Sequence, residues 1–531
     1  MQRGDFRAGA GEFVLEHAQA LGFSGLTGES LGESDAGLIS FGARLVERAA
    51  QLLEPALEQE GPVRGRYAFS QGKGTMCHYS EMREFAKPGR PGPSKSQPYD
   101  GLAYQSCEGG MAMSISRRDL LFASGMSLLT SLRPFRPGAA PPPQQPQTPT
   151  TPQARLLAAL QGNRLPLTMT DGPAGLGWDW LVQQARAAHF TLIGEEHGVH
   201  ETAQLATALF DTLRESGYGR MAIELSPIIA QDIEAAGRRH GLQGILDFFA
   251  EPTTWSPMYL REEAQFLAAV VTGAPNKSRV IWGFDREIFS DRYLIAKLEA
   301  KVPARARTSL TRVKEASTNS APFLFTQDPA LVSAVRADWP NPDRDSDMIL
   351  RTLEESLAIN AVARTGTAWD SAQRRALWMR NNLAARLREE RGRGSPPKVM
   401  LKFGYNHMIR GANYVNIFDL GAMTDEVAAL NEGRAFHILV LPGPGSHQAV
   451  LGPGRSFNSV SSDEFDEFRA GDQRLTRVLP NAAATGHEVI DLRPLRALAM
   501  RGLDSWNPDV VRTIHGYDAA LIWKAARASS A

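Results

Sequence analysis

Cysteine is nearly absent from this chain of 531 residues. The two cysteines, Cys77 and Cys107, both lie upstream of Met111. If the segment upstream of Met111 is missing from the mature protein, that protein can form no disulfide. It then also offers no thiolate nucleophile and no zinc–thiolate cluster.

An excess of charge of either sign is also missing, because 58 Lys and Arg residues match 58 Asp and Glu residues. A balanced chain gives no indication of a basic surface for nucleic acid or for an anionic membrane. The hydrophobic and charged fractions, 43% and 22%, are those of an ordinary globular protein. We therefore expect no nucleic-acid partner.

Several common catalytic signatures are absent or out of context. The chain has no P-loop, and no G-x-G-x-x-G motif opens a helix after a predicted strand. This argues against an NTPase and against a nicotinamide enzyme. The one G-x-S-x-G motif, at residues 28–32, has no preceding strand and fails the context test for an α/β-hydrolase.

A hydrophobic run long enough to cross a membrane is lacking as well. Residues 120–132 form an uncharged, mostly apolar run of thirteen residues. A helix of that length rises about 20 Å, which is short of the roughly 30 Å of a bilayer's hydrocarbon core. We therefore expect no permanent membrane span.

The same run follows Arg117 and Arg118, and small residues and proline follow it at residues 138–141. This order of a charged region, an apolar region and a cleavage zone is typical of a twin-arginine signal peptide. We interpret residues 111–140 as that signal, with a short buried helix as the alternative. The expected partner is the twin-arginine export machinery, and the expected location is periplasmic or secreted, in a bacterium.

An export signal works at an N-terminus, yet this one follows a long upstream segment. Met111 and Met113 stand directly before the signal. We hypothesise that translation begins at one of them and that residues 1–110 reflect a gene start placed too far upstream. The alternative is a genuine N-terminal extension.

Residues 141–154 are rich in proline, glutamine and threonine, a composition that favours extended polyproline conformations. We predict a linker there. The remaining residues, 155–531, are enough for one large domain or two smaller ones. We interpret them as an α/β domain.

Short β-like runs alternate with longer helical stretches in this domain. The runs at residues 189–193 and 221–225, with the helical spacing at residues 201–216 between them, predict a right-handed βαβ unit. Further strands are expected at residues 279–284, 398–403, 436–441, 488–492 and 517–523, and a long helix at residues 370–391. The predicted fold class is α/β, a mostly parallel sheet flanked by helices, with the site at the C-terminal ends of the strands.

Polar side chains follow these strand ends, which share one edge of a parallel sheet. We predict that they bind a small-molecule substrate. The predicted catalytic residues are His197, Glu195, Glu224 and His407, and the predicted substrate-binding residues are Glu196, Asp285, Arg286, Tyr405 and Arg410.

His197 is central to this prediction because it follows a strand and precedes a helix, next to Glu196. A histidine in that setting can act as a general base whose pKa is raised by neighbouring carboxylates. Its spacing from His200 would also allow both imidazoles to bind one metal ion. A third alternative is that His197 only caps the start of the helix.

Two stretches, TLIGEEHG at residues 191–198 and AIE at residues 222–224, resemble the superfamily that joins erythromycin esterases, ChaN-type haem-uptake proteins and Tiki-type proteases. Its hallmark is a strand that ends in Gly-Glu, a histidine shortly after, and a second strand that ends in an apolar-Glu pair. The resemblance covers residues 180–525. Further similar stretches are WGFD at 282–285, a helix carrying Arg375, Met379, Asn382 and Leu383, Asn406 with His407, and the closing strands at 489–493 and 517–521.

In the esterase branch the first histidine is the general base. The resemblance thus implies His197 as base, with Glu195, Glu224 and His407 in support. Only Glu196 separates Glu195 from His197, as in the haem-uptake branch, whereas the esterases have two intervening residues.

The leading hypothesis is an exported hydrolase in which His197 activates water against an ester, lactone or amide-like carbonyl. Arg286 or Arg410 would stabilise the oxyanion. The alternative is a periplasmic ChaN-type protein that binds haem or a divalent metal through His197, Tyr405 or His407. A third hypothesis is an inherited site that is no longer active.

Two expectations test the hydrolase hypothesis. The side chains of His197 and His407 should lie within about 10 Å of each other, since both must engage one proton or one water. The pKa of His197 should be raised, and any hydrolytic rate should climb with pH through the neutral range.

Overall fold

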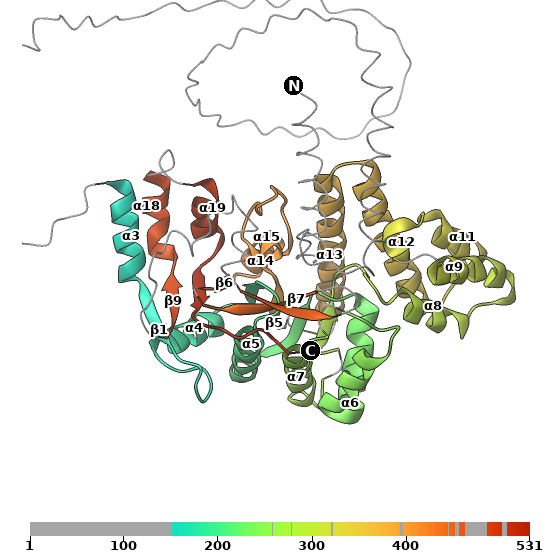
Figure 1. The fold of residues 1–531 in the computed structure, drawn as a ribbon, viewed down its shortest axis with the longest axis horizontal. Helices are drawn as coiled ribbons and strands as arrows, with labels where there is room; N and C mark the ends of the chain where they lie inside the picture. The colour runs from blue at the N-terminus through green and yellow to red at the C-terminus, as the bar shows by residue number, and fades with distance from the viewer. Residues whose placement is uncertain are drawn as a thin grey trace, which may run out of the picture. The chain divides into compact units, whose positions relative to one another are not determined.

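The computed structural model describes residues 151–530, apart from 257–258, 278, 320–321, 393, 395–396, 444, 452–455, 462–485 and 502–506 (Figure 1). The predicted N-terminal extension, the signal peptide and most of the linker therefore lie outside the described residues. Helix α3, Pro152–Gly162, begins within the last residues of the predicted linker.

A mostly parallel sheet of eight strands forms the centre of the described chain, in the order β1-β9-β10-β6-β2-β5-β3-β4. Strands β10, β6, β2, β5, β3 and β4 are parallel neighbours in that order, whereas β9 runs antiparallel to both β1 and β10. The predicted α/β class is thus confirmed. The strands are β1 Arg164–Leu167, β2 Phe190–Glu195, β3 Tyr218–Ile223, β4 Ile281–Gly283, β5 Lys398–Gly404, β6 Ala435–Pro442, β9 His487–Asp491 and β10 Ala519–Trp523.

Strand β5, which begins at Lys398, lies between β2 and β3, although these end far earlier in the chain, at Glu195 and Ile223. Its register aligns Ile193 with Lys402, and the same Lys402 with Ile223 of β3. The strand–helix–strand unit predicted from residues 189–225 is present, but its two strands are not neighbours. As a result, the C-terminal ends of three strands from distant parts of the chain meet side by side.

Helices cover both faces of the sheet (Figure 1). One face packs against α4 Leu176–Arg186, α5 His200–Leu213, α6 Pro227–Ala250 and α7 Arg261–Thr272. The other face packs against α3, α13 Ala368–Arg391, α14 Tyr405–Met408, α15 Leu420–Leu430, α18 Arg496–Arg501 and α19 Pro508–Gly516. The apolar runs predicted as strands are therefore buried on both sides, which explains why they show little alternation.

A block of helices lies between β4 and α13; the sequence predicted helical stretches between most strands but did not give the bounds of these. It consists of α8 Asp291–Glu299, α9 Arg307–Asn319, α10 Phe323–Thr326, α11 Ala330–Asp338 and α12 Arg344–Thr365. Its apolar residues, such as Leu310, Val335 and Leu353, join the core on the α5–α7 side of the sheet.

A hairpin outside the main sheet, β7 His447–Leu451 and β8 Phe457–Ser461, reaches the loop that follows β2. The amide of Ala449 donates to the carbonyl oxygen of Gly198 over 2.8 Å, and so does the amide of Ser529. Gly198 has a φ of +79°, and a Cβ there would lie 2.1 Å from the Ala449 carbonyl oxygen. The loop that carries His197 thus requires glycine at this position.

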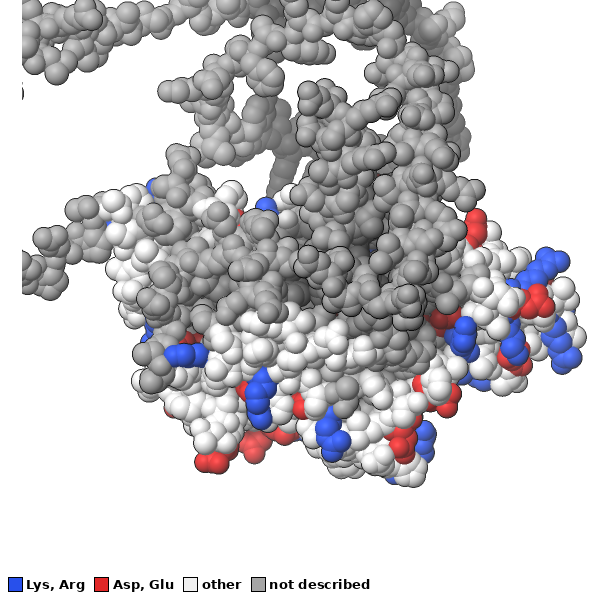
Figure 2. All heavy atoms as spheres, in the orientation of Figure 1, with Lys and Arg blue, Asp and Glu red and all other residues white. Residues whose placement is uncertain are grey.

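None of the helices among the described residues is both long and apolar enough to cross a membrane. Figure 2 shows acidic and basic side chains interspersed over the described part of one face.

Candidate functional site

Three strand ends supply the residues of the site. Strand β2 ends at Glu195 and leads into the loop with His197, β3 is followed by Glu224, and β5 leads into α14 with His407. The order β2-β5-β3 places these ends side by side, so the four residues predicted as catalytic converge.

Glu224 lies between the two imidazoles. Its Oε2 atom is 3.5 Å from His197 Nε2, and its Oε1 atom is 3.5 Å from His407 Nε2. A single carboxylate therefore separates the two rings. This contact bears out the expectation that His197 and His407 lie close together, although 210 positions separate them in the chain.

A second carboxylate holds the other nitrogen of each ring. His197 Nδ1 lies 3.0 Å from Glu195 Oε1, and His407 Nδ1 lies 2.7 Å from Asp419 Oδ2. Asp419 also caps α15, because its other oxygen accepts a hydrogen bond from the amide of Leu420. Carboxylates at Nδ1 fix both the ring orientation and the tautomer, so that Nε2 faces the space around Glu224.

Arg375 of α13 fixes Glu224. Its Nη2 donates to Glu224 Oε1 over 2.6 Å, and its Nε and Nη2 bind both oxygens of Asp285. The amide of Gly404 donates to Glu224 Oε2 over 2.7 Å. A Cβ at Gly404 would lie 3.2 Å from His197 Nε2, so glycine at this position gives the imidazole room to approach the carboxylate.

Beneath Glu195 lies a buried ion cluster on the α5–α7 side of the sheet. Lys402 Nζ donates to Glu195 Oε1 over 2.6 Å and to Glu263 Oε1 over 2.7 Å. Lys402 is fully buried. A buried lysine in a central strand is stabilised only when such partners surround it.

The charges of this site displace several pKa values. Burial lowers the pKa of His197, but half of that side chain is exposed, and Glu195 and Glu224 together raise the pKa to about 10. The pKa of His407 is also raised, because Asp419 and Glu224 outweigh burial and the charge of Arg375. Burial would raise the pKa of Glu224, yet His407, His197 and Arg375 hold it well below its ordinary value. Both rings thus favour the imidazolium form.

The residues predicted to bind substrate differ in their burial and in their hydrogen-bond partners. Asp285 is buried and bound to Arg375, so it positions Arg375. Arg286 is buried next to Asp285. Arg410 pairs with Asp425 and Asp518, which favours a structural role for it.

Glu196 and Tyr405 directly follow β2 and β5. Glu196 is buried, and its amide donates to the carbonyl oxygen of Val440 over 3.3 Å. The Tyr405 ring packs edge-on against Tyr414, and its carbonyl oxygen accepts a hydrogen bond from the Tyr517 hydroxyl.

The residues around His197 do not fit a metal ion. The alternative partner, His200, binds Glu262 of α7 over 3.1 Å, so the two histidines have different partners. Among the described residues, no group of three or more His, Cys, Asp or Glu side chains is placed to hold a metal.

Three supporting residues were missed by the sequence analysis: Lys402, Glu263 and Asp419. Lys402 gave a usable signal, because it is a charged residue within the apolar run of β5. Glu263 and Asp419 gave none, since each lies in a stretch that resembles an ordinary helix start.

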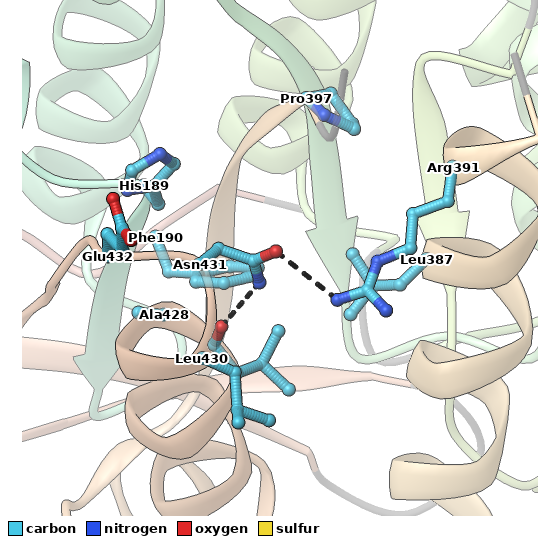
Figure 3. Close-up of a pocket in the computed structure, with 10 residues that line it drawn as sticks. His189, Phe190, Leu387, Arg391, Pro397, Ala428, Leu430, Asn431 and Glu432 are labelled. Atoms are coloured by element: carbon cyan, nitrogen blue, oxygen red, sulfur yellow. Dashed lines mark hydrogen bonds between the residues drawn. The ribbon is translucent and has the colours of Figure 1, made fainter. Parts of the chain in front are cut away.

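A separate pocket of about 350 Å³ lies near the starts of β2 and β5, away from their C-terminal ends (Figure 3). It is lined by His189, Phe190 and Pro397 and by the ends of α13 and α15. None of the residues that contact Glu224 lines it.

Of three comparisons with known proteins, only the comparison with solved structures gave matches. No protein-family model matches the chain, and no curated protein matches it. A Bacillus cereus protein is 13% identical, with a TM-score of 0.48, and the match covers 71% of this chain and 98% of that one.

The erythromycin esterase EreC, in its open conformation, is 12% identical over 69% of this chain and 98% of its own, with a TM-score of 0.48. ChaN of Campylobacter jejuni, described as binding haem cofacially, is 11% identical over 53% of this chain and 91% of its own, with a TM-score of 0.26.

Proposed function

We propose that this chain is a hydrolase in which His197 activates water for attack on the carbonyl carbon of an ester, lactone or amide-like bond. The observation that carries the proposal is the placement of two imidazoles on one carboxylate. His197 Nε2 and His407 Nε2 each face a different oxygen of Glu224, while Glu195 and Asp419 hold their Nδ1 atoms.

A carboxylate at Nδ1 is the arrangement by which a histidine base is oriented in hydrolases. In the proposed reaction, His197 takes a proton from water, and the hydroxide forms a bond to the carbonyl carbon. The bond to the leaving oxygen or nitrogen then breaks, and His407 supplies the proton that this group requires. His197 is the ring that water reaches, because 51% of its side chain is exposed against 12% for His407.

The raised pKa of His197 sets the pH range of this reaction. With a pKa of about 10, the ring is protonated at neutral pH and becomes a base only as the pH rises. We therefore expect the rate to climb about tenfold per pH unit toward pH 10. The sequence predicted a climb through the neutral range, and the strength of the contacts with Glu195 and Glu224 moves that climb to alkaline pH.

The test is a panel of chromogenic esters, lactones and amides assayed with the full chain between pH 6 and 10.5. Turnover should fall by about 10²- to 10⁴-fold in His197→Gln and in His407→Gln. His240→Gln is the matched control, because His240 is exposed on α6. Turnover that His197→Gln leaves unchanged would exclude His197 as the base.

Haem binding is the second candidate, and the exposure of half of the His197 side chain favours it. Haem titration separates the two. A Soret band lost in His197→Gln, without turnover of any carbonyl substrate, would replace the hydrolase with a haem-binding protein.

Export through the twin-arginine pathway is part of the proposal and rests on Arg117, Arg118 and the apolar run after them. Fractionation of the native bacterium should place the protein in the periplasm or medium, and Arg117→Lys with Arg118→Lys should retain it in the cytoplasm. Mass spectrometry tests the proposed start, since peptides from residues 4–90 would show that the upstream segment is translated.

A further inference from the structure

Arg286 is a buried arginine that takes part in no ion pair with the described residues. It follows β4 directly after Asp285, and 7% of it is exposed. None of the ion pairs found among the described residues includes it, although Arg375 and Lys402 nearby each bind two carboxylates.

The guanidinium is held in place on one side only. Nη1 donates to Asn360 Oδ1, and Asn360 is itself fixed by a hydrogen bond of 2.8 Å to the carbonyl oxygen of Leu324. The Phe325 ring lies 5.8 Å from the Arg286 Cζ atom. Nε is buried and has no acceptor, and Nη2 has none among the described residues.

The nearest acidic residues are already engaged. Asp285 binds Arg375 through both oxygens. The carboxylate of Glu287 accepts hydrogen bonds from Ser226 and from the amides of Ile288, Phe289 and Ser290. Burial and the charge of Arg375 lower the pKa of Arg286 to about 10. An isolated buried charge is costly, so this guanidinium is suited to an anion that arrives from outside.

We infer that Arg286 forms an anion-binding subsite, and that the substrate carries a carboxylate or phosphate group besides the bond that is hydrolysed. The free Nε and Nη2 atoms share one edge of the guanidinium, and that edge binds two oxygens of one anion. Asn360 holds the opposite side and thereby fixes the direction of the edge. This inference rests on the proposed function for the nature of the reacting bond.

The subsite adjoins the proposed reaction centre. Arg286 neighbours Asp285, and Arg375 links Asp285 to Glu224, which faces both imidazoles. Arg375 compensates the charges of Asp285 and Glu224, which would otherwise repel an anion. An aromatic wall of Phe325, Phe289 and Trp255, with ring centroids 6.1 and 4.5 Å apart, continues from the guanidinium. Such a wall restricts water and strengthens the ion pair.

The first experiment compares matched esters: 4-nitrophenyl acetate and mono-4-nitrophenyl succinate or glutarate. The carboxylate-bearing esters should be preferred by about 10- to 100-fold in kcat/KM. Arg286→Met should abolish that preference, so that both classes of ester react with similar kcat/KM, whereas Arg286→Lys should restore part of the preference. Arg351→Met is the control, because Arg351 is exposed on α12, the helix of Asn360. An equal rate for neutral and anionic esters, unchanged in Arg286→Met, would overturn the inference and leave the hydrolase intact.

The second experiment does not require turnover. Isothermal titration of His197→Gln with inorganic phosphate and with succinate should show binding that is lost in the double variant with Arg286→Met. Asn360→Leu should weaken anion binding as well. This variant tests the subsite if Arg286→Met does not fold. Arg286-dependent binding, combined with no turnover of any ester, lactone or amide by the wild-type chain, would retain the subsite and reject the proposed function. Absence of Arg286-dependent binding of either anion and of an ester preference would reject the subsite.

Discussion

Lys402 and Glu195 form an ion pair of 2.6 Å from which solvent is excluded, since 0% and 1% of their side chains are exposed. The same oxygen of Glu195 lies 3.0 Å from His197 Nδ1. The imidazole that reaches solvent is therefore joined, through one carboxylate, to a charge inside the sheet.

Lys402→Met is expected to lower the free energy of unfolding by about 3–5 kcal/mol, because Glu195 and Glu263 lose their buried counter-ion. Urea denaturation of the full chain measures this change. Lys301→Met is the control: Lys301 is half exposed and pairs with Asp343, so about 1 kcal/mol or less is expected. Equal losses in both variants would contradict a stabilising role for the buried pair.

The stability of the fold should depend on the protonation of His197. Its pKa is raised from 6.5 to about 10 in the folded chain, so the stabilisation is complete below pH 6.5 and is lost as the pH rises through about 10. Other groups titrate in this range, and the informative quantity is the difference between wild type and His197→Gln. That difference should shrink between pH 6.5 and 10.5. Direct titration of the His197 ring proton by NMR should give an alkaline midpoint; a midpoint at or below 6.5 would refute the expectation.

Glu224→Gln should move the pH dependence of hydrolysis toward neutrality. Removing the carboxylate between the rings lowers the pKa of His197, so the base form appears at lower pH. The rate profile between pH 6 and 10.5 measures the shift. Glu355→Gln is the matched control, since Glu355 is half-buried and pairs with the exposed Arg374. An unshifted midpoint in Glu224→Gln would mean that a group other than His197 controls the profile.

Asp419 both caps α15 and places a negative charge at His407 Nδ1. Asp419→Asn removes the charge and keeps a residue that can cap the helix. Asparagine also caps helices, so α15 should remain folded, while the pKa of His407 falls and its tautomer is no longer fixed. We expect kcat to fall by about 10²- to 10⁴-fold with little change in thermal stability. Asp343→Asn makes the same change at the cap of α12 and should leave kcat unaffected. Similar kcat values in both variants would rule out a role for the Asp419 charge.

Gly198→Ala tests the loop that carries His197. The added Cβ would collide with the Ala449 carbonyl oxygen, in addition to the strain of a positive φ. Gly217→Ala has a positive φ of 94° but meets nothing closer than 3.9 Å, so it measures the strain alone, about 1–2 kcal/mol. A larger stability loss in Gly198→Ala, together with weaker hydrolysis, is the expected result. Equal losses would show that β7 yields to the new side chain.

The sequence predicted the position of strands that are marked by a run of apolar residues. Each apolar run read as a strand overlaps one, from β2 at Phe190–Glu195 to β10 at Ala519–Trp523. Strand β1, Arg164–Leu167, was missed because it is four residues long and contains Pro166. The bounds of helices α8 to α12 were not predicted, because no strand between them marks where one helix ends and the next begins.

The site was predictable to the extent that it follows the strand ends. His197, Glu224 and His407 could be placed on one edge because parallel strands share their direction. Their partners could not, since Arg375, Asp419 and Glu263 lie on helices whose rotation and register depend on packing. The alkaline pKa of His197 followed only from knowing that two carboxylates contact the same ring.

The central place of β5 also determines when the site can form during folding. Strands β2 and β3 each leave an unpaired parallel edge until residues 398–404, far later in the chain, join them. Contacts across such a separation form slowly, and open edges are the segments at which partly folded chains associate. Assembly around Glu224 is therefore expected as a late step, and the aggregation-prone interval should end when β5 is in place.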